Sequence, residues 1–263
     1  MKAKVLSVYD EGSLPGTPLI GAKGLSFLIE VDDERTLFGT GLRGNYLRHN
    51  MDHLQIDPDT IDRIVISHMH SDHIGGLSAF LERRKEKIDV YVTPDHAGVR
   101  NERVMGFPVK RSGFPKMNDG LREKMNVIEV SEGTELSDNL LISGIMPSAD
   151  GGVPSVPENM LILTTRTGPV MICGCCHQGV AAAAAFVESI TEKKISAIVG
   201  GTHLIGMRKE EIYGVAEALA ERGPPKLYLC HCTGVPQKMR LRERLTLKGV
   251  SDFYAGTEIQ FDL

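Results

Sequence analysis

The sequence contains no tryptophan, and among its 263 residues it has only 8 phenylalanines and 6 tyrosines. Stacking of nucleic-acid bases on aromatic side chains is therefore not expected. An excess of basic residues is also missing, since 30 Lys and Arg stand against 34 Asp and Glu, for a net charge of −4. A general nucleic-acid binder usually has the opposite balance. We expect no nucleic-acid partner.

Long apolar runs are absent as well. The longest, Val180–Val187, is mostly alanine and falls far short of the ~20 residues that a membrane helix needs. The first residues, MKAKVLSVYDEGSLPG, show no apolar core of a signal peptide. We therefore expect a cytoplasmic protein without a membrane partner.

The five cysteines do not suit a disulfide framework. They are odd in number and fall in two short stretches, as Cys173, Cys175, Cys176, Cys230 and Cys232. Adjacent cysteines make poor disulfide partners, and a chain of this length can bury a core of its own. We expect reduced thiols, buried or near a metal. A structural zinc site built from all five is a weaker hypothesis, because C-x-C-C is not the common finger spacing.

The first half of the chain reads as antiparallel strands, and the second half alternates helices and strands. This pattern predicts an α/β (α+β) protein whose sheets are covered by helices. Since no Pro/Ser-rich linker interrupts it, we expect one domain, 1–263. The expected strands are 3–9, 26–31, 36–38, 62–67, 90–93, 127–130, 140–146, 160–165, 170–173, 195–199, 227–230 and 258–261. The expected helices are 45–54, 76–87, 179–193, 209–222 and 236–248.

Residues 94–125 show no clear period and are too many for a plain connection, which predicts an insertion or lid. A basic lid on an acidic protein could receive an anionic substrate, whereas a solvated basic loop is the simpler interpretation. Its basic residues are Arg100, Arg103, Lys110, Arg111, Lys116, Arg122 and Lys124.

The strongest motif follows the apolar strand at 62–67 and reads SHMHSDHIGGL. In extended chain, residues i and i+2 point the same way, so His68 and His70 can bind one ion. A turn then presents Asp72 and His73 to a second ion. Imidazole and carboxylate ligands suit Zn²⁺, and also Mn²⁺ or Fe²⁺.

Three further histidines complete the pattern. His177, His203 and His231 each follow an apolar strand and precede a helix. Side chains in this position lie at the rim of a sheet, where α/β proteins commonly place their sites. The sequence thus predicts one convergent metal site.

These segments identify a resemblance that runs through nearly the whole chain. The blocks KGLSFLIE, LFGTG, IVISHMHSDHIGGL, ENMLILTTRTGPVMICGCCHQG, VGGTHL and LCHCTG resemble the metallo-β-lactamase fold superfamily. Within it they resemble the branch related to the archaeal dihydropterin–ribofuranosylaminobenzene phosphate synthase, a transferase of methanopterin assembly. The resemblance implies an αββα sandwich of two mixed sheets with a site for two metal ions.

The resemblance also implies roles for single residues. His68, His70 and His177 would bind the first ion, and Asp72, His73 and His231 the second. His203 is either a ligand or an acid/base group. Cys175 stands where many relatives have a bridging Asp, and either a ligand or a small buried residue fits there. The candidates for substrate contact are Lys23, Thr202, Thr233 and Gly234.

Two departures from the superfamily pattern bear on the site. Relatives usually read DTG where this chain has Gly39-Thr40-Gly41, so a supporting carboxylate is missing. They often have His where this chain has Lys23. Both departures bear on which substrate the protein takes and on whether both metal positions are occupied.

The leading hypothesis is an enzyme dependent on two divalent ions, most simply Zn²⁺, that acts on a small anionic, phosphorylated, pterin-like molecule. The reaction is hydrolysis or pterin transfer with release of diphosphate, with Asp72 and His203 as catalytic groups. The alternative is a degenerate relative that binds a pterin or nucleotide without turnover. Assembly into a homo-oligomer is left open.

Overall fold

The computed structural model describes residues 1–94, 101–104, 107–110 and 112–263, with side chains for 1–94 and 112–263. Contacts between Cα atoms divide the chain into two compact units. The N-terminal unit comprises Ala3–Ser131 and Tyr254–Gln260. The C-terminal unit comprises Glu132–Phe253 with Met1–Lys2 and Phe261–Leu263. The expectation of a single domain stays a prediction.

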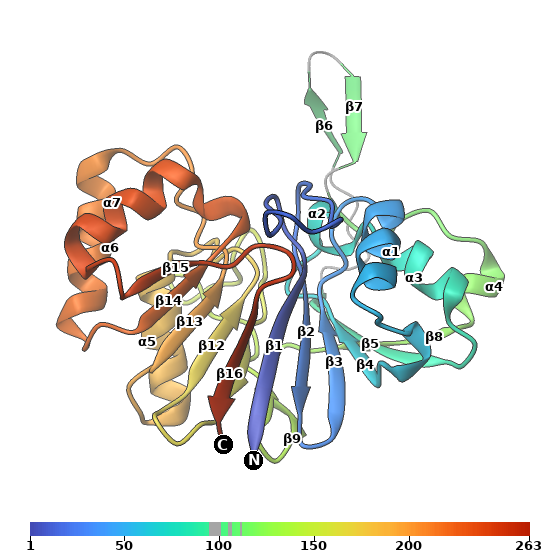
Figure 1. Cartoon of the computed structure of the whole chain (residues 1–263), viewed down its shortest axis with the longest axis horizontal. Helices are drawn as coiled ribbons and strands as arrows, with labels where there is room; N and C mark the ends of the chain where they lie inside the picture. Colours follow the sequence, from blue (N-terminus) through green and yellow to red (C-terminus); the bar gives the residue numbers. More distant parts are fainter. Residues whose placement is uncertain (95–100, 105–106, 111) are drawn as a thin grey trace. The chain divides into compact units, whose positions relative to one another are not determined.

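The N-terminal unit contains a seven-stranded mixed sheet in the order β16-β1-β2-β3-β4-β5-β8 (Figure 1). Strands β1 to β3 pair antiparallel, and β3, β4, β5 and β8 pair parallel. The bounds are β1 Lys2–Tyr9, β2 Ser26–Val31, β3 Glu34–Phe38, β4 Arg63–Val65, β5 Ile88–Val92, β8 Met125–Glu129 and β16 Glu258–Asp262.

Short helices cover one face of this sheet. Leu47 and Met51 of α1 and Leu77 and Phe80 of α3 are fully or almost fully buried in a core that includes Ile64 of β4. Burial of such side chains is worth about 1.5–3 kcal/mol each before chain entropy is counted. The bounds are α1 Gly44–His53, η1 Pro58–Thr60, α2 Ser71–Ile74, α3 Leu77–Arg83 and α4 Asp119–Arg122.

The C-terminal unit has a second seven-stranded mixed sheet, in the order β15-β14-β13-β12-β11-β10-β9. Strands β12 to β15 run parallel, and β9 to β12 pair antiparallel. The bounds are β9 Thr134–Ser137, β10 Leu140–Ile142, β11 Leu161–Leu163, β12 Val170–Cys173, β13 Ala197–Gly200, β14 Lys226–Leu229 and β15 Val250–Asp252.

Helices α5 (Val180–Thr191), α6 (Lys209–Glu221) and α7 (Val235–Leu245) pack on one face of this second sheet, as Figure 1 shows. Val187, Ile212 and Leu241, one from each helix, share a core with Met171 and Ile198 of the strands. All residues of β12 are buried, on both faces of the strand. This explains why the sequence there is a continuous apolar run rather than an alternating one.

The predicted fold class is confirmed: two mixed sheets are flanked by helices. The helix predicted at 76–87 is wrong at its end and stops at Arg83. Arg84 is extended and almost buried, because its guanidinium donates at 2.6 Å to the carbonyls of Pro58 and Ile61. The strand predicted at 140–146 ends at Ile142, before Gly144 with its φ of 76°.

Strands β9 and β15 were not expected from the sequence. Strand β9, TELS, is only partly buried, and β15 has three residues, VSD, so neither carries an apolar pattern. Of the predicted lid, residues 95–100, 105–106 and 111 lie outside the described residues. Within it, β6 (Asn101–Val104) pairs antiparallel with β7 (Phe107–Lys110). The side chains of Arg100, Arg103, Lys110 and Arg111 lie outside the description.

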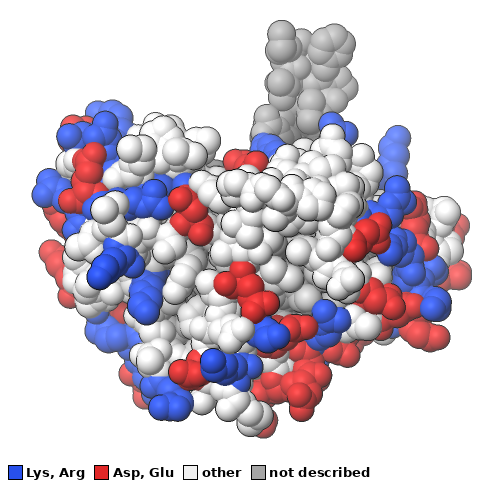
Figure 2. Space-filling view, viewed as in Figure 1, with Lys and Arg blue, Asp and Glu red and all other residues white. Residues whose placement is uncertain are grey.

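The surface carries charges of both signs. On the face drawn in Figure 2, Lys and Arg are interspersed with Asp and Glu. Among the described residues, no helix is both long and apolar enough to cross a membrane.

A buried asparagine ties α1 to the start of the N-terminal unit. The amide of Asn50 is fully buried and donates to the carbonyls of Val8 (2.9 Å) and Ile20 (3.0 Å). Its oxygen accepts from the Ile20 N–H at 2.8 Å. Three backbone groups thus depend on one side chain.

We expect Asn50→Ala to lower the free energy of unfolding by about 2–3 kcal/mol, because it leaves buried backbone groups without their partner. Asn45 lies exposed on the same helix, so Asn45→Ala should change the value by less than about 0.5 kcal/mol. Urea unfolding measures both. Equal losses in the two variants would contradict the role of Asn50.

Candidate metal centre

The HMHSDH segment lies in the N-terminal unit, directly after β4. His68 and His73 are fully buried, and His70 immediately precedes α2. The turn is tight because glycines follow it: a Cβ on Gly75 would lie 2.4 Å from the Leu42 carbonyl oxygen, and one on Gly76 2.1 Å from that of Thr40. The glycines therefore allow the histidine turn to pack against the loop after β3.

The three imidazoles of this segment lie close together, and their role as metal ligands stays a prediction. His68 Nε2 lies 3.1 Å from His70 Nδ1, and the ring centroids of His68 and His73 are 4.1 Å apart. Ser67, which the sequence analysis did not single out, lies behind them: its Oγ is 3.0 Å from His68 Nδ1 and 3.5 Å from His73 Nδ1. Such contacts fix the orientation of imidazole ligands. The donor set fits a divalent metal of the zinc type.

Asp72 lies in the same turn, with the Lys23 ammonium 3.5 Å from its carboxylate. Gly24 permits this approach, since a Cβ there would lie 2.1 Å from the Asp72 carbonyl oxygen. Lys23 is thus a cation beside a predicted metal ligand and is more than half exposed. It is well placed to meet an anion from solvent.

Ser112 and Gly113, from the middle of the 94–125 segment, border the motif. Gly113 N–H donates to the Met69 carbonyl at 2.8 Å, and Ser112 forms a β-bridge with His70. The part of the predicted lid that the structure describes here therefore touches the histidine segment.

Gly39, where relatives have an aspartate, adopts a left-handed backbone with φ of 76°. A Cβ at this position would lie 2.8 Å from the Leu25 carbonyl oxygen. The neighbouring Thr40 is buried, and both its N–H (2.7 Å) and its hydroxyl (3.2 Å) donate to the His73 carbonyl. The loop supports His73 through its backbone and through Thr40, and its conformation requires glycine.

In the C-terminal unit, parallel strands bring three histidine-bearing loops to one edge of the sheet. His177 follows β12, His203 follows β13, and His231 opens the single turn η3 (His231–Thr233) after β14. The rings of His177 and His203 are 4.5 Å apart between centroids. A Cβ on Gly201, after β13, would lie 2.4 Å from the carbonyl oxygen of Gly174, after β12, so these loops touch backbone to backbone.

Cys232 belongs to this group, whereas the sequence suggests it as a metal ligand only within a site of all five cysteines. The ligand atoms of Cys175, His203 and Cys232 all lie within 4.8 Å of one another. His203 N–H also donates to Cys232 Sγ at 3.2 Å. The Cys175 thiol, and less strongly His203, hold the pKa of Cys232 well below its ordinary value although burial opposes this. The contact with Cys232 raises the pKa of His203.

All five cysteines are buried, and none of them forms a disulfide. Cys173 and Cys176 pack in the apolar core of the unit, and the pKa of Cys176 is raised by its contact with Cys173 and by burial. Only Cys175 and Cys232 are grouped with a histidine in this unit. A site built from all five cysteines has no support in this arrangement.

Glu158 is a second functional residue that the sequence analysis missed. Its carboxylate, only 7% exposed, accepts the backbone N–H groups of Cys175 (2.6 Å), Cys176 (3.2 Å) and His177 (2.9 Å). Burial raises its pKa, and the three N–H groups act in the opposite direction.

The predicted substrate residues of this unit have structural contacts. Thr202 and Thr233 are buried, and the Thr202 N–H (3.2 Å) and hydroxyl (3.0 Å) both donate to the Thr233 hydroxyl. Gly234 precedes α7 with φ of 79°. These contacts join two of the loops, and contact with substrate stays a prediction for all three residues.

Comparison with known proteins gives the family. The family model described as the metallo-beta-lactamase superfamily matches residues 20–184. The chain belongs to this superfamily. The match includes His68 to His73 and His177 but ends before His203 and His231.

Three proteins match this superfamily member over almost its whole length. It is 26% identical to the 7,8-dihydropterin-6-methyl-4-(beta-D-ribofuranosyl)-aminobenzene-5'-phosphate synthase of Methanocaldococcus jannaschii, over 98% of this chain and 96% of the relative. A crystal structure described as a metal-dependent hydrolase of the beta-lactamase superfamily matches with a TM-score of 0.79 and 26% identity, covering 98% of each chain. The metallo-beta-lactamase fold protein YhfI of Bacillus subtilis, 13% identical with a TM-score of 0.63, shares the fold.

We expect that restoring the aspartate of relatives, Gly39→Asp, destabilises the protein by about 1–3 kcal/mol, because the residue is left-handed and its Cβ meets a carbonyl. Gly16 has a similar φ of 79° with nothing within 4 Å of its Cβ position. Gly16→Asp therefore measures the conformational cost alone and should lose less. Urea unfolding compares the two, and an equal or smaller loss for Gly39→Asp would contradict the steric argument.

Proposed function

We propose that this superfamily member is a metal-dependent enzyme that acts on a small anionic, phosphorylated, pterin-like substrate. The observation that carries the proposal is the contact of three imidazoles in the turn after β4. The reaction class, hydrolysis or pterin transfer with release of diphosphate, is drawn from the similarity to the synthase and to the metal-dependent hydrolase.

We assign the ligands by the resemblance to the superfamily. His68, His70 and His177 would hold one divalent ion, and Asp72, His73 and His231 the other, with Cys175 as a further donor. Imidazole and thiolate donors favour Zn²⁺, and Mn²⁺ or Fe²⁺ are the alternatives. Two such ions would activate water and stabilise negative charge on phosphate oxygens.

The roles of the protein's own residues follow from their contacts. Lys23 would exchange its contact with Asp72 for a substrate phosphate, leaving the Asp72 carboxylate to orient the attacking group or a metal. His203 is more exposed than His231, and its contact with Cys232 raises its pKa. His203 therefore suits the transfer of a proton to a leaving group. The buried thiols, none of which forms a disulfide, suit a reducing compartment, and we propose the cytoplasm.

A second candidate function is binding of a pterin or nucleotide without turnover. The observation that favours it is Gly39, whose backbone excludes the aspartate of relatives, together with Cys175 in place of the bridging aspartate. Metal content and turnover separate the two candidates.

For metal content, we expect about two ions per chain by elemental analysis after supplementation with Zn²⁺. His68→Ala should lose at least one ion, because it removes a central ligand. His53 is an exposed histidine of α1, so His53→Ala should keep the wild-type content. A wild-type protein that holds no metal would contradict the enzyme and favour the binder.

For activity, the Zn²⁺-loaded protein is assayed with a generic phosphodiester and with a pterin diphosphate plus an aryl acceptor. We expect turnover of one of them, reduced by at least ~100-fold in His68→Ala, since loss of a ligand disturbs both charge and geometry. His53→Ala is again the matched control. The enzyme hypothesis fails if neither substrate turns over in a protein that holds its metal.

A further inference from the structure

The loop that carries Cys175 and His177 is held by a single buried carboxylate. Glu158 Oε1 accepts the N–H groups of Cys175 and Cys176, and Oε2 accepts that of His177. We propose that Glu158 is a positioning residue for the metal ligands of the C-terminal unit. The proposal rests on the proposed function only in that His177 and Cys175 are taken as ligands.

Sheet register explains why Glu158 meets this loop. Strands β11 and β12 pair antiparallel, with Leu161 opposite Ile172. Extending that register by three residues on each side places Glu158 opposite Cys175. The pairing of β11 with β12 does not continue to this position. There the Glu158 carboxylate, instead of backbone carbonyls, accepts the N–H groups of the loop that follows β12.

The loop conformation suits an anion. Cys176 is left-handed, with φ of 56°, and the successive N–H groups of Cys175, Cys176 and His177 all point to one carboxylate. Such a concavity of backbone N–H groups binds negative charge. Glu158 supplies that charge from within the protein, so the loop has one preferred shape before any metal arrives.

Glu158 itself is not placed as a ligand or an acid/base group. It is 7% exposed, and three backbone N–H groups already use acceptor positions on both of its oxygens. A carboxylate has about four such positions in all. Its effect on chemistry therefore acts through the loop, by fixing where the Cys175 and His177 side chains begin.

The test is Glu158→Gln, with the metal affinity of the purified full-length protein as the first readout. A glutamine keeps the shape but turns an NH₂ group toward at least one backbone N–H. We expect Zn²⁺ affinity to fall by about 10–100-fold, the usual effect of losing a group that orients ligands. The near-ultraviolet thiolate-to-metal absorption of the Co²⁺-loaded protein should weaken, which reports a disturbed thiolate ligand.

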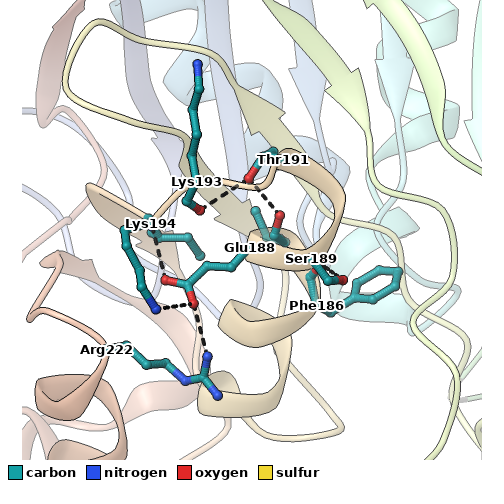
Figure 3. A network of polar contacts seen from close by, with 9 residues as sticks. Phe186, Glu188, Ser189, Thr191, Lys193, Lys194 and Arg222 are labelled. Atoms are coloured by element: carbon teal, nitrogen blue, oxygen red, sulfur yellow. Dashed lines mark hydrogen bonds and ion pairs between the residues drawn. The ribbon is translucent and has the colours of Figure 1, made fainter.

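Glu188 provides the matched control. This carboxylate of α5 also holds a backbone N–H, that of Ile195 at 3.3 Å, and pairs with Lys194 (3.3 Å) and Arg222 (3.0 Å), as Figure 3 shows. It lies in the same unit, near the C-terminal end of α5, whereas His177 precedes the N-terminal end of that helix. Glu188→Gln should lower thermal stability but leave Zn²⁺ affinity within about two-fold of wild type.

The outcomes separate the two proposals. Wild-type protein that binds no metal contradicts the proposed function. Wild-type protein that binds metal while Glu158→Gln binds it equally well contradicts the positioning role, as does an equal loss of affinity in Glu188→Gln. If Glu158→Gln does not fold, hydrogen exchange in the wild type decides: protection of the amides of Cys175, Cys176 and His177 should match that of β12, and rapid exchange of all three contradicts the proposal.

Discussion

The close approach of backbone to backbone at the ends of the strands is the constraint on which the histidine loops of each unit depend. In the N-terminal unit, the histidine turn packs on the loop after β3, and a Cβ on Gly76 would lie 2.1 Å from the Thr40 carbonyl oxygen. In the C-terminal unit, Gly201 after β13 has the same relation to the carbonyl oxygen of Gly174 after β12, at 2.4 Å. A side chain at either glycine would force the loops apart. Within each unit, the glycines allow the loops that carry the histidines to pack closely together.

Loops packed this closely bury polar groups, and each such group has to find a partner. Ser67 meets the Nδ1 atoms of two histidines, Thr40 supports the carbonyl of His73, and Thr202 is joined to Thr233. Glu158 satisfies three N–H groups at once. These contacts give the ligand side chains fixed starting points, which reduces the reorganisation needed to bind an ion.

The sequence predicts those parts of the protein that depend on local pattern. The i, i+2 spacing of His68 and His70 and the glycines behind them are sufficient for the histidine turn. Apolar runs are sufficient to place His177, His203 and His231 at strand ends. Strands β9 and β15 escape prediction because they are short and carry no apolar pattern, and the helix from Leu77 ends early because of contacts that Arg84 makes with a distant turn.

Glu158 and Cys232 could not be found from local pattern, since each acts through a residue far away in the chain. Glu158 meets Cys175 only through the register of β11 on β12, which requires the strand pairing to be known. Cys232 meets His203 only because β13 and β14 are parallel neighbours. The sequence alone shows only a carboxylate three residues before the buried strand β11, without the partner that explains it.

The two departures from the superfamily pattern share a chemical direction. Gly39 lacks the supporting carboxylate, and its left-handed backbone disfavours an aspartate at this position. Cys175 replaces a second carboxylate with a thiol, and it lies with Cys232 and His203 in one group. Oxygen donors suit Mg²⁺ and Mn²⁺, whereas thiolate and imidazole suit Zn²⁺. On the proposed function, a thiol at Cys175 beside the histidines would favour zinc over manganese.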